Sequence, residues 1–169
     1  MKWQLHASLG LLLSFFLTAC ATPQTGDKVS FFADIPTGSI LTINQPLTIP
    51  ANEARATLQF SKQISVSQLD TWEPFCQMHV RTLLRKNRQI PKTDFHITRV
   101  IRDEAPFSNE ISFTWLTKTT MHLESKEESD IYQLVCGQVW DGATSRRLYM
   151  NELKEAVGDY LSIQKNTSH

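Results

Sequence analysis

The sequence predicts a mainly β protein, a small antiparallel barrel or sandwich of about seven or eight strands with one C-terminal helix. Three observations support this fold class. Short apolar-rich runs bounded by turn residues recur along the chain, several of them alternate between apolar and polar residues, and only the last run has a helical period. The length of 169 residues is typical of one domain with one core.

The first strands are expected to be short, because each apolar run soon meets a turn residue. They are "GSILTIN" (38–44), "PLTIP" (46–50), "ARATLQF" (54–60) and "KQISVS" (62–67).

A longer strand is expected over residues 75–84, which alternate cleanly. Cys76, Met78 and Val80 share one face, which we expect to be buried. The opposite face carries Gln77, His79 and Arg81. The charged continuation "RTLLRKNRQ" (81–89) is interpreted as a solvated strand end and turn.

Three further strands follow, over residues 95–101, 113–125 and 131–140. In the first, Arg99 falls on the face of Phe95 and Ile97, so a bulge or a paired arginine is needed there. The second places Lys118, Thr120 and His122 opposite its large apolar residues. The third is expected to be its hairpin partner across a charged turn.

The C-terminal part is expected to hold a short strand, "RRLYM" (146–150), and then a helix over residues 151–163. Asn151 is a good N-cap, and apolar residues from Leu153 to Leu161 form one stripe. Gly158 offers an alternative end for the helix.

The N-terminal segment has the layout of a secretory signal peptide. Lys2 precedes the apolar run "LGLLLSFFL" (9–17), which is too short for a membrane span of about 20 residues. Leu17-Thr18-Ala19-Cys20 then resembles the lipobox of bacterial lipoproteins. This resemblance implies cleavage of residues 1–19 and lipidation of Cys20, with acyl chains such as palmitate as the membrane anchor.

The same resemblance implies a location for the protein. Ala21, in place of Asp after the lipidated cysteine, implies the outer membrane of a Gram-negative cell. The periplasmic face is expected, and exposure on the cell surface stays open. Together with "WEPFC" (72–76) and "YQLVCG" (132–137), the lipobox resembles small lipoproteins of gammaproteobacteria, which implies no activity and no site residues.

The remaining chain divides into a tether over residues 20–37, a β-rich domain over 38–163 and a tail over 164–169. With Cys20 used for lipid in an oxidising compartment, we expect a disulfide between Cys76 and Cys136, with two buried thiols as the alternative. Phe31 and Phe32 in the tether are expected to dock onto the domain, the bilayer or a partner.

Composition and motifs argue against several functions. Lys plus Arg equals Asp plus Glu, 17 against 17, which disfavours binding of nucleic acid. No P-loop, nucleophile elbow or zinc-protease motif occurs, so we predict no enzyme activity and no cofactor. His79, His96 and His122 match no ligand spacing, so no metal site is predicted.

The sequence therefore predicts a non-enzymatic binding or assembly module of the cell envelope with a protein partner. The alternatives are a β-barrel that binds a lipid or small molecule, and an envelope hydrolase of unrecognised type. The outer polar face is either a partner site or simply solvated, and Trp72 either anchors a partner or packs on its own core. The candidate interface residues are Phe31, Phe32, Trp72, His79, Arg81 and His122.

Overall fold

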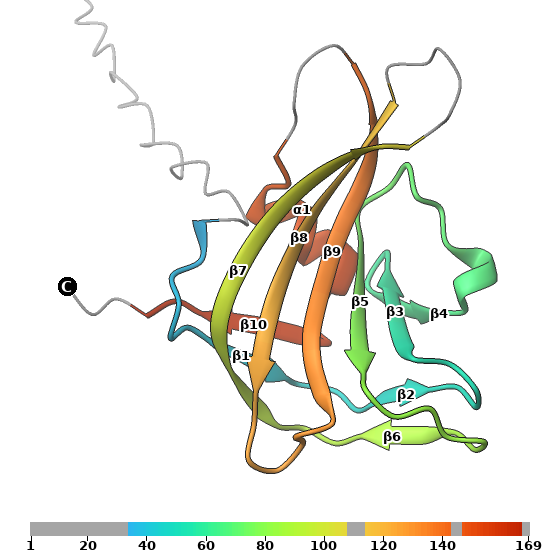
Figure 1. Ribbon diagram of the computed structural model, residues 1–169, viewed down its shortest axis with the longest axis vertical. Helices are drawn as coiled ribbons and strands as arrows, with labels where there is room; N and C mark the ends of the chain where they lie inside the picture. Colours follow the sequence, from blue (N-terminus) through green and yellow to red (C-terminus); the bar gives the residue numbers. More distant parts are fainter. Residues whose placement is uncertain (1–33, 108–113, 143–146, 167–169) are drawn as a thin grey trace, which may run out of the picture.

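The computed structural model describes residues 34–107, 114–142 and 147–166. Along these parts of the chain lie ten strands, one α-helix and one short 3-10 helix (Figure 1). Their bounds are β1 (Ile40–Ile43), β2 (Leu47–Ile49), β3 (Arg55–Gln59), β4 (Lys62–Ile64), the 3-10 helix η2 (Val66–Gln68), β5 (Phe75–Val80), β6 (Arg88–Ile90), β7 (Asp94–Pro106), β8 (Thr114–Glu124), β9 (Ile131–Asp141), α1 (Met150–Val157) and β10 (Leu161–Gln164).

Eight strands form one antiparallel sheet in the order β10-β1-β7-β8-β9-β5-β3-β4, while β2 and β6 form a separate two-stranded ribbon. The long strands β7, β8 and β9 curve strongly, so that the sheet becomes a half-barrel with α1 on its inner side (Figure 1). The predicted fold class, a mainly β protein with one C-terminal helix, is confirmed.

The gap in the half-barrel lies between its two edge strands, β10 and β4. Helix α1 covers part of this gap and packs against β3 and β5. The turn between β3 and β4 holds the helix, because the Ser61 amide donates to the Ala156 carbonyl and the Ser61 hydroxyl to the Glu155 carbonyl, both at 3.1 Å. Strand β4 is also tied to the ribbon, since the Gln63 carboxamide hydrogen-bonds both backbone groups of Thr48.

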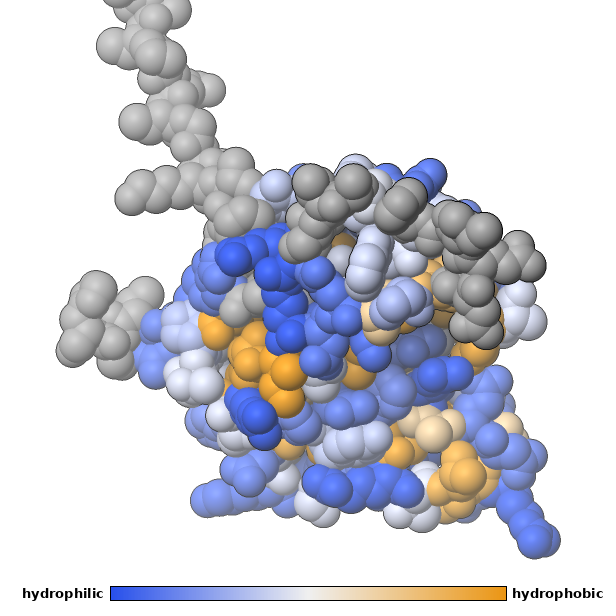
Figure 2. Space-filling view, turned by 45° about the horizontal axis from the view of Figure 1, so that its top comes forward, coloured by the Kyte–Doolittle hydropathy of each residue, from blue (hydrophilic) through white to orange (hydrophobic). Residues whose placement is uncertain are grey.

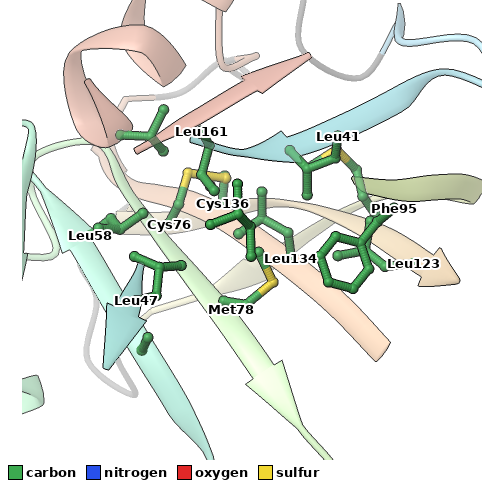
Figure 3. Close-up of a cluster of buried hydrophobic side chains, with 14 of the residues drawn as sticks. Leu41, Leu47, Leu58, Cys76, Met78, Phe95, Leu123, Leu134, Cys136 and Leu161 are labelled. Carbon is green, nitrogen blue, oxygen red and sulfur yellow. A yellow bond between two sulfur atoms is a disulfide. The ribbon is translucent and has the colours of Figure 1, made fainter. Parts of the chain in front are cut away.

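The core fills the concave side of the sheet and the underside of α1. Successive strand residues point to opposite faces, so Cys76, Met78 and Val80 enter this core as their alternation predicted. Figure 3 shows side chains from β1, β5, β7, β9 and β10 converging there. Its fully enclosed large side chains are Leu41, Ile43, Leu47, Leu58, Met78, Ile90, Phe95, Ile97, Met121, Ile131 and Leu134.

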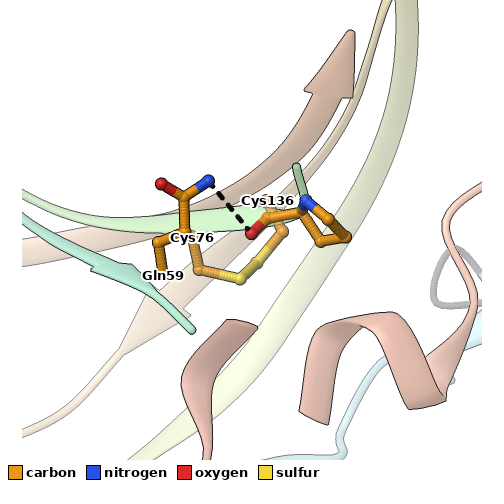
Figure 4. The surroundings of a disulfide bond; sticks show 4 residues. Gln59, Cys76 and Cys136 are labelled. Carbon is orange, nitrogen blue, oxygen red and sulfur yellow. Dashed lines mark hydrogen bonds between the residues drawn. A yellow bond between two sulfur atoms is a disulfide. The ribbon is translucent and has the colours of Figure 1, made fainter. Parts of the chain in front are cut away.

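The predicted pairing of Cys76 with Cys136 is found as a disulfide between β5 and β9 (Figure 4). The two residues are direct register partners, and their Cα atoms lie 4.1 Å apart. Beside the bridge, buried Gln59 holds the loop between η2 and β5. Its carboxamide donates to the Asp70 carbonyl at 2.6 Å and accepts from the Asp70 amide at 3.1 Å.

The helix expected over residues 151–163 does not reach residue 163, and its alternative end at Gly158 is confirmed. Helix α1 ends at Val157, and residues 161–164 pair with β1 as strand β10. Gly158 causes the break, since its φ is +54° and a Cβ there would lie 2.4 Å from the Ser61 Cβ. The helix also begins at Met150, within the run that was expected to be a strand.

Two other predictions concern local strand geometry. The bulge expected near Arg99 is confirmed, because the register of β7 against β8 shifts between Ile97 and Arg99 and turns Arg99 outward. Residues 81–89 were interpreted as a solvated strand end and turn. This interpretation was wrong for the last two of them, because residues 88–90 form strand β6, which pairs with β2.

Candidate functional site

One lateral row of polar side chains crosses five adjacent strands on the convex face of the sheet. Register pairs join Arg55 to His79, His79 to Gln133, Gln133 to His122 and His122 to Arg99. Directly paired residues place their side chains on the same face, about 5 Å apart. We call these five residues the polar row.

His79 lies between Arg55 and Gln133 in the row. Its Nε2 atom is enclosed and has no hydrogen-bond partner among the described residues. A buried polar nitrogen without a partner is uncommon in a folded protein. The ring of Tyr132 meets the imidazole edge to face, with centroids 6.3 Å apart, so one side of His79 is closed by an aromatic ring.

Burial, and secondarily the charge of Arg55 beside it, lowers the pKa of His79 to about 4. Both effects disfavour the protonated ring, because burial removes water and Arg55 repels a second positive charge. At neutral pH the imidazole is therefore uncharged and able both to donate and to accept one hydrogen bond.

Arg81 extends the row beyond the end of β5. Its guanidinium carbon lies 4.9 Å from the centroid of the Tyr132 ring, a cation–π contact that orients both side chains. The structure thus brings three of the predicted interface residues, His79, Arg81 and His122, to one region of the surface.

Two acidic residues of the turn between β8 and β9 are bound by Arg88. Asp130 and Glu128 both form ion pairs with Arg88 of β6, and Asp130 also accepts from the Thr82 hydroxyl at 2.8 Å. Burial alone would raise the pKa of Asp130, but hydrogen bonds from Thr82 and Arg88 and the charge of Arg88 outweigh it and lower that pKa. This cluster fastens β6 to the β8–β9 turn.

Gln77 was expected to be an outward, solvated residue and is instead only 6% exposed. Its carboxamide donates to the Thr57 hydroxyl and accepts from the Arg55 guanidinium, each at 3.4 Å. The convex face is therefore partly sealed beside the row, and this packing limits the freedom of Arg55.

Trp72 lies apart from the polar row. It is 50% exposed in the loop before β5, and its carbonyl accepts from the Gln138 side chain at 2.7 Å. Gln138 and Gln133 are five residues apart on β9, which corresponds to roughly 17 Å along a strand. Cys20, Phe31 and Phe32 lie outside the described residues.

Sequence patterns did not identify three members of the row or its aromatic neighbour. No functional role was predicted for Arg55, Gln133 and Tyr132, although they lie in predicted strands. Arg99 was noted only because it falls on the same face as Phe95 and Ile97 in the predicted strand. The missing information was strand order, because β5 pairs with β9 across more than 50 residues of sequence.

No protein-family model, no curated protein and no solved structure matches this chain. Within the described ranges, no group of three or more His, Cys, Asp or Glu side chains is placed to hold a metal ion. None of the helices in those same ranges has the length and apolar character needed to cross a membrane.

Proposed function

We propose that this protein is a lipid-anchored, non-enzymatic binding module of the cell envelope, whose polar row contacts an acidic surface of a protein partner. The anchor is the lipid on Cys20, and the tether places the domain at the periplasmic face of the outer membrane. The single observation that carries the binding role is the row itself, which crosses five strands of one sheet.

Two features support a partner site at the row. Arg55 and Arg99 of the row and the neighbouring Arg81 provide cationic donors, and arginine and tyrosine are among the residues that contribute most to protein interfaces. Among the described residues neither Arg55 nor Arg99 forms an ion pair, so both guanidinium groups can meet a complementary acidic surface.

The first experiment reverses the charge at the two ends of the row. In cells treated with a crosslinker, Arg55→Glu/Arg99→Glu should lose the adducts formed by the parent chain. The matched control is Arg85→Glu/Lys92→Glu, which makes the same change of charge at exposed positions outside the row. If both double variants lose the same adducts, or both keep them, the row is not the partner site.

The second experiment tests the anchor separately. Cys20→Ala should leave an unprocessed precursor that takes up no label from a palmitate analogue, because the sulfur that accepts the lipid is gone. Cys76→Ala/Cys136→Ala is the control, since it removes cysteines that are engaged in the disulfide and should keep the label. Equal labelling of parent and Cys20→Ala would overturn the lipoprotein assignment.

A further inference from the structure

On the opposite side of the sheet from the polar row, a space lies between α1 and the strands β1 and β10. A pocket of about 650 Å³ opens there. This volume is within the range of about 300–1,000 Å³ that is usual for ligand pockets. Hydrophobic side chains also gather among hydrophilic ones on the face of the molecule shown in Figure 2.

The pocket arises from where the helix is held. Ser61 fastens the end of α1 to the β3–β4 turn, and the helix packs on β3 and β5. After Gly158 the chain turns away at once and adds β10 to the far edge of the sheet, beside β1. The helix and the edge strand are thus separated by a space that side chains from both of them line.

The walls of this space are apolar. Leu41, Leu134 and Leu161 form its inner wall and belong to the core cluster drawn in Figure 3. Met150, Leu153 and Val157 of α1 line its helical side. These helix positions follow one face over two turns, so that this wall is about 10 Å long.

Polar groups gather at the margin. The pocket is bordered by Asn44, Asn151, Lys154, Asp159 and Ser162. Among the described lining residues, Lys154 is the one cation and Asp159 the one anion. Protein cores are close-packed, and an apolar hollow of this size beside the core favours an apolar occupant over water.

We propose that this pocket binds the acyl chain of a single-chain lipid, with the alkyl part along α1 and the polar head at the margin near Lys154. An elongated apolar wall with polar groups only at its border matches an amphiphile with one long chain. A polar ligand would find few hydrogen-bonding groups inside. This inference is independent of the polar row, which lies on the other face of the sheet.

The test is a fluorescence titration with cis-parinaric acid on the chain from residue 21, which contains every described element. We expect saturable binding that palmitate displaces. Ile163→Trp and Met150→Trp each place a large ring at a half-buried position of the pocket and should weaken binding at least tenfold. Leu83→Trp, at a position 61% exposed outside the pocket, is the control and should bind like the parent.

The competitor identifies the source of the chain. Displacement by palmitate alone indicates a free fatty acid, and displacement also by lysophosphatidylcholine indicates a membrane lipid, and both results support the site. Absence of saturable binding, or equal binding in all three tryptophan variants, would overturn it. So would binding that appears only after Phe31→Ala/Phe32→Ala, because the tether itself would then be the occupant.

The row variants separate the two proposals. Arg55→Glu/Arg99→Glu should bind cis-parinaric acid as the parent does, within twofold, because neither residue lines the pocket. If this variant does not bind cis-parinaric acid, the titration detects binding at the convex face and the pocket proposal is wrong. If this variant loses the crosslinked adducts and still binds the lipid, the result supports both proposed sites.

Discussion

The two faces of the strands β5, β8 and β9 differ more than their shared backbone suggests. On the concave face, Met78, Leu134 and Met121 are neighbouring register partners and are fully buried. The sequence neighbours of these three residues, His79, Gln133 and His122, lie on the convex face. One face thus stabilises the fold, whereas the other carries polar groups that packing alone does not require.

This contrast shows why a binding site can change without loss of the fold. A one-residue step along a strand moves a side chain from one face to the other. Concave positions are constrained by volume, because cavities and added bulk are both costly in a close-packed core. Convex positions are constrained mainly by hydrogen bonds and charge.

The largest expected effect compares adjacent residues of β9. Leu134→Ala should lower the free energy of unfolding by about 2–5 kcal/mol, since it leaves a cavity at a fully buried position. Gln133→Ala should change it by no more than about 0.5 kcal/mol, since it alters a half-buried position on the convex face. Urea titrations of both variants measure the difference, and equal losses would contradict the assignment of the faces.

The next effect concerns the covalent crosslink between β5 and β9, which lies on the concave face. Cys76→Ala/Cys136→Ala should lower the free energy of unfolding by about 2–4 kcal/mol, because the bridge closes a 60-residue separation that otherwise adds entropy to the unfolded chain. Adding a reductant should destabilise the parent and leave the double variant unchanged. A loss below about 1 kcal/mol would mean that packing alone holds β5 to β9.

Part of the concave face was predictable from the sequence, because alternation in residues 75–84 and 113–125 placed Cys76, Met78 and Met121 on buried faces. The sequence offered Gly158 as an alternative end of the helix, but it did not indicate strand β10, because Leu161 also continues the apolar stripe of the helix. Strand β6 was not predictable either, because it begins in a charged run. Its partner strand, β2, lies about 40 residues earlier in the chain.

The polar row depends on information that periodicity does not contain. Alternation identified His79 and His122 as outward residues, but their approach through Gln133 requires the order of β5, β9 and β8 in the sheet. The pocket required even more, because it depends on where the helix ends and on which edge β10 joins. Local patterns therefore predicted the faces, and tertiary pairing built the sites.

A smaller effect is expected from pH on the convex face. The folded-state pKa of His79, about 4, lies below the ordinary value of 6.5. Between these values the unfolded chain binds a proton that the folded chain does not, so the free energy of unfolding falls as pH decreases from about 6.5 to 4. One pKa unit corresponds to about 1.4 kcal/mol, and partial solvent contact reduces the expected total loss to about 1–2 kcal/mol.

Variants of the two histidines test this assignment. His79→Gln should remove that part of the pH dependence, whereas His122→Gln, on the other side of Gln133, should keep it. The measurement is the urea midpoint between pH 4 and 7. An unchanged pH profile in His79→Gln would show that the ring titrates as it does in water.

The smallest expected effect on stability is at Trp72. The side chain is 50% exposed, and its loop is held by backbone contacts that do not need the indole: the Trp72 amide donates to the Asp70 carboxylate at 3.0 Å, and the Trp72 carbonyl accepts from Gln138. Trp72→Ala should therefore change the free energy of unfolding by about 0.5 kcal/mol or less.

Thermal melting followed by circular dichroism measures this change. The destabilised reference is Phe75→Ala, at a buried position three residues later. If Trp72→Ala keeps its melting temperature and loses crosslinked partners, the indole belongs to an interface of its own, roughly 17 Å along β9 from the polar row. If it unfolds as readily as Phe75→Ala, the indole is part of the core and the convex face alone remains as the partner surface.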